Sequence, residues 1–232
     1  MHESLGYVLR AKPYSESGWV VDLWTLSAGR VRCFARPAKQ RGKVQKGHLQ
    51  SFLLLRLNWH TRVEPGRLTQ TDECRRHRIP ANRLIYGIYL NELLLRLLQT
   101  ELELPELFSA YQHALQQLVQ PEVDAVMVSM QFELALLEAL GHHLNLWKDD
   151  VDGDAISASD NYGYAIGSGL IPENKQWAGP VWLPIEGVVL HWLREPQWLP
   201  DELLSAKLRL FLDRLWGQLS NKPLNSRSLL PH

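Results

Sequence analysis

The chain has 232 residues, 45% of them hydrophobic, and its 25 Lys and Arg residues balance 25 Asp and Glu residues. This length allows one large domain or two small ones, each with an ordinary apolar core. No apolar stretch approaches the roughly 18 residues of a membrane span, none has the pattern of a signal peptide, and the two cysteines are too few for a disulfide framework.

Short extended segments fill the first part of the chain. Pro13, the Ala28-Gly29 pair and the loop from Gly42 to Gly47 separate them. The segments rich in β-branched, aromatic or alternating side chains are 5–12, 18–26, 30–35, 50–59 and 67–74. Five short strands with no helix between them predict a small closed barrel of the OB type, the commonest such module that binds oligonucleotides.

The hydrophobic period becomes that of a helix near residue 80. Apolar side chains recur three and four residues apart from Leu90 to Leu98 and from Phe132 to Leu140, where Gly141 provides a C-terminal glycine. Two more helices are expected over 105–119 and 201–219, and a hairpin over 162–171. The sequence predicts an α+β protein, with a five-stranded OB-fold β-barrel over residues 1–78 and a mainly α-helical domain over 79–232.

The two predicted domains carry opposite charge. Residues 1–80 hold 15 Lys and Arg against 6 Asp and Glu, whereas residues 81–232 hold 10 against 19. The first segment attracts polyanions because binding releases their condensed counterions. The second segment would be repelled by a phosphate backbone. We expect the barrel to bind nucleic acid and the helical domain to bind protein.

The strand that begins at Arg30 gives the sharpest local signal. Alternate residues of a strand share a face, so three arginines and one aromatic ring project together while Cys33 points into the barrel. Guanidinium groups around such a ring can hold phosphates and stack a base. The alternatives are an ordinary solvated basic face and a Phe34 turned inward by a bulge. The candidate DNA-binding residues are Arg10, Lys12, Arg30, Arg32, Phe34, Arg36, Lys39, Arg41, Lys43 and Lys46.

No catalytic motif is found, so we expect no enzymatic activity, no cofactor and no metal site. The acidic stretch from Asp149 to Asp154 lacks the bidentate Glu of a calcium loop and is interpreted as a solvated loop. His142 and His143 are adjacent and cannot both face one metal ion. Five tryptophans of the helical part are expected to fill its core: Trp147, Trp177, Trp182, Trp192 and Trp198.

Short motifs follow one another in a characteristic order. The barrel contains Ser-Glu-Ser at 15–17, Asp-Leu-Trp-Thr at 22–25, Gly-Arg-Val-Arg from Gly29 through Ala35-Arg36, and Gly-His-Leu-Gln-Ser-Phe at 47–52. The helical part contains Tyr-Leu-Asn-Glu-Leu-Leu at 89–94, Phe-Glu-Leu-Ala-Leu-Leu at 132–137 and Lys-Pro-Leu-Asn-Ser-Arg at 222–227. This ordered set resembles the RecO family of bacterial recombination mediators and DNA repair proteins.

The resemblance implies an OB-fold, a helical C-terminal domain and a cytoplasmic, nucleoid-associated protein without catalytic chemistry. It also implies binding to single- and double-stranded DNA and annealing of complementary strands. With RecR, and RecF where present, such proteins help load RecA onto DNA coated by single-stranded DNA-binding protein (SSB). Many members carry a four-cysteine zinc site, which is not expected here because Cys33 and Cys74 are the only thiols.

Two points remain open at the level of sequence. Met130-Gln131 stands where the family often has basic residues, which suggests an apolar pocket between helices for the acidic tail of SSB. The alternative function is an OB-fold module that binds RNA or protein without mediator activity. An annealing assay with complementary DNA strands separates the two.

Overall fold

A computed structural model describes residues 1–40, 42–61, 65–175, 177–179, 182–195, 201–220 and 222–230. They form two compact units. The first contains Met1–Ala125 together with Leu224–His232, and the second contains Val126–Pro223. Among the described residues, no helix is long and apolar enough to cross a lipid bilayer.

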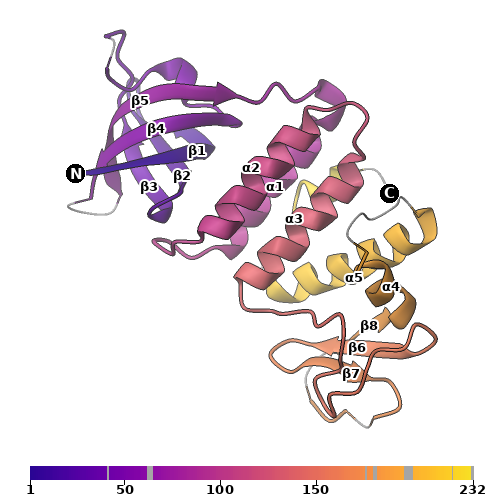
Figure 1. Cartoon of the computed structure of the whole chain (residues 1–232). Coiled ribbons are helices and arrows are strands. Elements are labelled where there is room, and N and C mark those ends of the chain that lie inside the picture. The colour runs from indigo at the N-terminus through magenta and orange to yellow at the C-terminus, as the bar shows by residue number, and fades with distance from the viewer. Residues whose placement is uncertain are drawn as a thin grey trace. The chain divides into compact units, whose positions relative to one another are not determined.

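The first unit opens with a closed barrel of five strands in the order β1-β2-β3-β5-β4, shown from indigo to purple in Figure 1. Its strands are β1 (His2–Pro13), β2 (Trp19–Thr25), β3 (Gly29–Ala35), β4 (Leu53–His60) and β5 (Gly66–Arg76). The pairing of β3 with β5 is parallel and the other pairings are antiparallel. All five predicted strands are confirmed, and so is the α+β class with an N-terminal OB-type barrel.

Strand alternation builds the interior of the barrel. In β3, buried residues alternate with exposed or half-buried ones, so Val31, Cys33 and Ala35 point inward. They pack with Val21, Leu55 and other apolar side chains in one core. Burial raises the pKa of the Cys33 thiol to about 12, which makes it an inert core side chain, as predicted.

Two helices belong to the same compact unit as the barrel. They are α1 (Leu84–Leu97) and α2 (Pro105–Leu118), as the 3.6-residue period predicts. Tyr7 of β1 packs against Phe108 and Tyr111 of α2, with ring centroids 5.7 and 5.1 Å apart. The segment after Leu224 returns to this unit, where Glu92 of α1 accepts hydrogen bonds from the Asn225 and Ser226 N–H groups.

The second unit contains α3 (Ala125–Ala139), α5 (Glu202–Leu219) and a small sheet. The predicted hairpin is present as β6 (Asn161–Ala165) and β7 (Gly169–Pro172), while β8 (Trp182–Glu186) and α4 (Gly187–Trp192) were not predicted. Fully buried Glu133 of α3 binds Arg209 of α5 through two hydrogen bonds of 2.6 Å. Trp216 donates a third to the same carboxylate.

Two sequence expectations for this unit are wrong in part. Asp149 is buried rather than solvated, and it accepts N–H groups of Val151, Asp152 and Asp154. Burial opposes its ionisation, but these bonds prevail and hold the pKa of Asp149 below its ordinary value. Trp147 is 64% exposed and does not fill the core. Trp192 is buried, Trp177 and Trp182 are half-buried, and Trp198 lies outside the described residues.

Candidate nucleic-acid interface

The outer face of β1, β2 and β3 carries two cross-strand rows of candidate residues. Arg10, Asp22 and Arg32 are neighbours in register in the first row. In the second row, Lys12 pairs with Val20, Val20 with Phe34, and Phe34 with Arg67 of β5. Side chains opposite each other on paired strands lie on one face within contact range. The structure therefore gathers Arg10, Lys12, Arg32 and Phe34 on one face, and their role in DNA binding stays a prediction.

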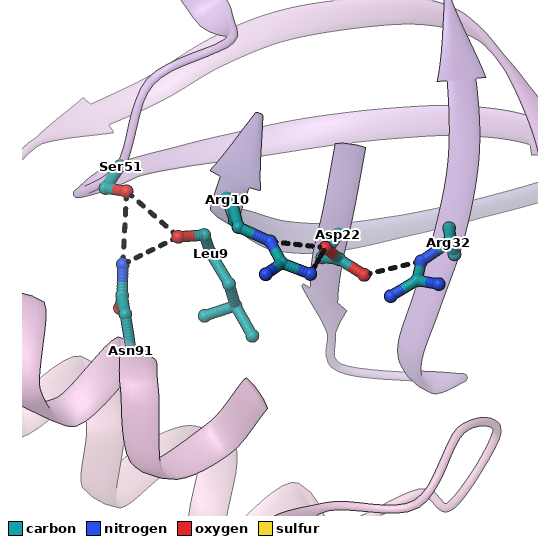
Figure 2. Close-up of polar contacts among 6 residues, drawn as sticks. All are labelled: Leu9, Arg10, Asp22, Arg32, Ser51 and Asn91. Atoms are coloured by element: carbon teal, nitrogen blue, oxygen red, sulfur yellow. Dashed lines mark hydrogen bonds and ion pairs between the residues drawn. The ribbon is translucent and has the colours of Figure 1, made fainter. Parts of the chain in front are cut away.

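A bulge in β1 turns Arg10 to this face. The register between β1 and β2 shifts between Val8 and Arg10, so Leu9 is an extra residue. Without that shift, strict alternation from inward-facing Val8 would point Arg10 inward as well. The Leu9 carbonyl instead accepts from Asn91 Nδ2 of α1 at 3.2 Å and from Ser51 Oγ at 3.3 Å (Figure 2). Helix α1 thus fixes the irregularity that exposes Arg10.

Asp22 holds two of the candidate arginines side by side. Arg10 donates to its Oδ2 from Nη2 at 2.8 Å and from Nε at 3.0 Å, and Arg32 Nε donates to Oδ1 at 2.8 Å (Figure 2). The Asp22 side chain is 3% exposed, whereas the arginines are 41% and 46% exposed. Burial opposes ionisation of Asp22, but the hydrogen bonds and charges of the arginines prevail and lower its pKa. Each guanidinium keeps further N–H groups for a ligand.

The second row ends at a pocket of about 490 Å³ between the β1–β2 turn and the start of β5. Phe34 is partly exposed on this side and lies 5.2 Å from the ring of Tyr14, so the alternative of an inward-turned Phe34 is not realised. Arg36 and Arg67 also line the pocket, and both are exposed.

Arg30 takes a different position from its strand neighbours. It is half-buried, and its carbonyl accepts the Glu101 N–H. With Arg10 and Arg32 it lines a groove of about 770 Å³ whose other wall contains Ile88 of α1. Arg30 thus shares a groove with Arg10 and Arg32 but is less exposed than Arg32 and Arg36, because this end of β3 is bridged to Thr100.

The remaining candidates lie in the β3–β4 connection. Lys39, Lys43 and Lys46 are exposed, and Lys46 Nζ lies 6.0 Å from the ring centroid of Trp19. Arg41 lies outside the described residues. In the described part of the chain, no group of three or more His, Cys, Asp or Glu side chains could hold a metal ion.

Sequence reasoning missed three residues of this surface. Asp22 is charged in a strand whose other residues are uncharged, and such a charge signals a buried ion pair. Tyr14 follows Pro13 in a turn, which gives no signal of a site. Arg67 reaches Phe34 only through the parallel β3–β5 pairing, which strand patterns do not specify.

Comparison with known proteins extends over nearly the whole chain. Residues 1–75 match the family described as "Recombination protein O N terminal", and residues 81–181 match "Recombination protein O C terminal". The DNA repair protein RecO of Methylococcus capsulatus is 32% identical over 224 residues, which cover 96% of this chain and 90% of that protein. The DNA repair protein RecO of Actinobacillus succinogenes is 32% identical over 234 residues, with coverages of 98% and 94%.

Proposed function

The chain belongs to the RecO family of DNA repair proteins, and we propose that it is a recombination mediator that binds single- and double-stranded DNA. In this proposal it anneals complementary strands and, with RecR and in some settings RecF, helps RecA assemble on DNA coated by SSB. These steps are binding events, so the proposal contains no catalytic step. The location that we propose for them is the cytoplasm, at the nucleoid.

The Arg10–Asp22–Arg32 row carries the DNA-binding part of the proposal. It lies on the outer faces of β1 to β3, and Lys12 and Phe34 lie in the next row. The face of strands 2 and 3, with the loops at its end, is the surface that OB-folds use for oligonucleotides. Arginine suits this role because its planar fork binds phosphate oxygens in pairs.

A protein-binding role for the second unit rests on charge and on one pocket. Residues 126–223 hold 13 acidic and 7 basic side chains, and this acidic excess disfavours contact with phosphates. Met130 is fully buried, so it cannot itself offer the docking surface for the SSB tail that was expected of Met130-Gln131. A mainly apolar pocket of about 260 Å³ lies nearby in the same unit and is lined by Leu134, Leu137, Leu144, Leu146, Leu193 and Trp147, with Glu138, His142 and His143 as its polar members.

We propose this pocket as the site for the SSB tail. Arg194 stacks over the exposed Trp147 ring at 4.8 Å and would supply positive charge for the acidic end of the tail. The apolar lining would receive its hydrophobic side chains. RecR remains a proposed partner without an assigned surface.

A strand-annealing assay tests the proposed function. Two complementary oligonucleotides, each coated with SSB, should anneal faster with the protein than without it. If the protein accelerates the annealing of bare strands but not of coated strands, the proposed DNA binding stands and the proposed mediator role is refuted. If neither is accelerated, the alternative of an RNA- or protein-binding module takes its place.

A further inference from the structure

Two exposed aromatic rings touch each other at the end of the barrel. Tyr14 follows β1 directly, Phe34 lies near the end of β3, and their ring centroids are 5.2 Å apart with planes tilted by 58°. Tyr14 is 71% exposed and Phe34 is 36% exposed. Large aromatic side chains usually gain stability by burial, so two partly solvated rings in contact mark a surface that can still bury area against a ligand.

The backbone holds Tyr14 in place without help from its side chain. The Tyr14 and Ser15 N–H groups donate to the Gly18 carbonyl at 2.8 and 3.2 Å, and the Gly18 N–H donates back to the Ser15 carbonyl at 3.4 Å. The turn is therefore closed by its own peptide groups. The Tyr14 ring is free to serve a ligand, and its removal should not unfold the turn.

Positive charge flanks both rings. Arg36 follows β3 two residues after Phe34, and Arg67 is the register partner of Phe34 across the parallel β3–β5 pair. Both arginines line the pocket and are exposed. No ion pair among the described residues engages either arginine, whereas Arg10 and Arg32 share the Asp22 carboxylate. These two guanidinium groups are thus the ones most available to phosphate near the rings.

We propose that the pocket lined by Tyr14 and Phe34 is a slot in which an unpaired nucleobase stacks on these rings, and that Arg36 and Arg67 hold the phosphates on either side of it. The inference rests on the proposed DNA binding and specifies its substrate class as single-stranded nucleic acid. Every base has a π-face, so stacking on the slot accepts any sequence. A base inside a duplex is already stacked and paired, and it would first have to be extruded at an energetic cost. The slot therefore makes the barrel prefer single strands.

The test compares single-strand and duplex affinity of the full-length chain at one salt concentration. Tyr14→Ala and Phe34→Ala should each weaken binding of a single-stranded oligonucleotide by roughly 5- to 150-fold, the range expected for the loss of one base–aromatic stack. Duplex affinity should change by less than about twofold, because it depends on phosphate contacts. An oligonucleotide containing 2-aminopurine, whose fluorescence falls on stacking, should lose its quenching in both variants.

Three controls separate binding from folding. Tyr14→Phe keeps the ring and should retain the single-strand preference. Leu203→Ala removes an exposed apolar side chain of α5 and should change neither affinity. Thermal unfolding checks that each variant is folded; if Phe34→Ala is not, Tyr14→Ala decides alone, because its ring is mostly exposed.

The outcomes distinguish this inference from the proposed function. If the wild type binds DNA and the alanine variants lose single-strand and duplex affinity equally, or lose neither, the slot is refuted while the DNA-binding function stands. If the wild type binds neither form, the proposed function fails and the slot fails with it.

Discussion

Arg32 and Asp22 face each other across β2 and β3, with Arg32 Nε donating to Asp22 Oδ1 over 2.8 Å. The other carboxylate oxygen accepts from Arg10, so one buried negative charge lies between two half-exposed positive charges. The row presents one net positive charge to a polyanion, not two. The carboxylate thus lowers the charge of the surface while it fixes the planes of both guanidinium groups.

Replacing Asp22 with Asn should therefore strengthen salt-dependent DNA binding. One more positive charge becomes available to phosphate, so the slope of log affinity against log salt should steepen by about 0.9. Asn Oδ1 can still accept one of the two arginines. The measurement is fluorescence anisotropy over a salt series with single-stranded and duplex DNA.

Glu3→Gln is the matched control for that change. It removes the same charge from an exposed pair in which Arg56 Nε lies 4.0 Å from Glu3 Oε1, in the β1–β4 pairing rather than on the β1–β3 face. Its salt slope should stay at the wild-type value. A slope for Asp22→Asn that is equal to or shallower than wild type would show that Asp22 does not limit the available charge.

A triple change of Arg32, Arg36 and Arg67 to Ala should lower the salt slope by up to about 3, because each lost phosphate contact removes close to one unit. Arg30 is left in place because it is half-buried. Lys175→Ala is the control, since Lys175 pairs with Asp152 in the second unit. An unchanged slope in a folded triple variant would place the DNA path on another surface.

Much of this surface could be predicted from strand alternation. The pattern of β3 placed Arg32, Phe34 and Arg36 on one face because the side-chain period of a strand is two. Alternation alone does not place Arg10 on the same face. The extra residue Leu9 reverses the inward–outward alternation of β1, and only the register with β2 reveals this reversal. Arg67 depends on a parallel pairing between strands that are distant in sequence.

The helical part was predicted as elements but not as an assembly. The period of α1 and α2 is readable, yet their membership in the same unit as the barrel follows from contacts such as Tyr7 with Phe108. The hydrogen bonds from Asn225 and Ser226 to Glu92 connect residues more than 130 positions apart. Local patterns carry no information about such contacts.

His77 should make the stability of the first unit depend on pH. Burial, and then the nearby Arg75 charge, lower the pKa of His77 to about 4, and its Nε2 lies 3.1 Å from Tyr7 Oη. The unfolded chain binds a proton near pH 6.5 and the folded chain does not until about pH 4. Stability from this group is therefore present above pH 6.5 and is lost as the pH falls toward 4.

Urea unfolding at several pH values measures this loss. We expect the wild type to lose about 2 kcal/mol more than His77→Gln across that window, after allowance for solvent near the ring. Gln can keep a hydrogen bond to Tyr7 but has no proton to gain. Parallel pH profiles for the two proteins would contradict the assignment of this loss to His77.

Trp147→Ala should weaken binding of a peptide with the sequence of the acidic SSB tail and leave DNA affinity unchanged. Trp147 is exposed at the edge of the apolar pocket of the second unit, and truncation of such an aromatic anchor costs about 10-fold or more in affinity. The full chain is required, because a cut at residue 78 would divide the first compact unit and remove Phe108 and Tyr111 from their contacts with Tyr7.

The salt dependence of the same complex decides between two modes of docking. Apolar burial is not screened by ions, so the peptide affinity should change little over a salt range in which DNA affinity falls steeply. Among the described residues, Arg194 is the cation that stacks on the Trp147 ring. A single cation limits the ionic contribution to the peptide affinity. If peptide affinity falls with salt as steeply as DNA affinity and Trp147→Ala leaves it intact, then the tail binds a basic surface, and the barrel face proposed for DNA becomes its proposed site.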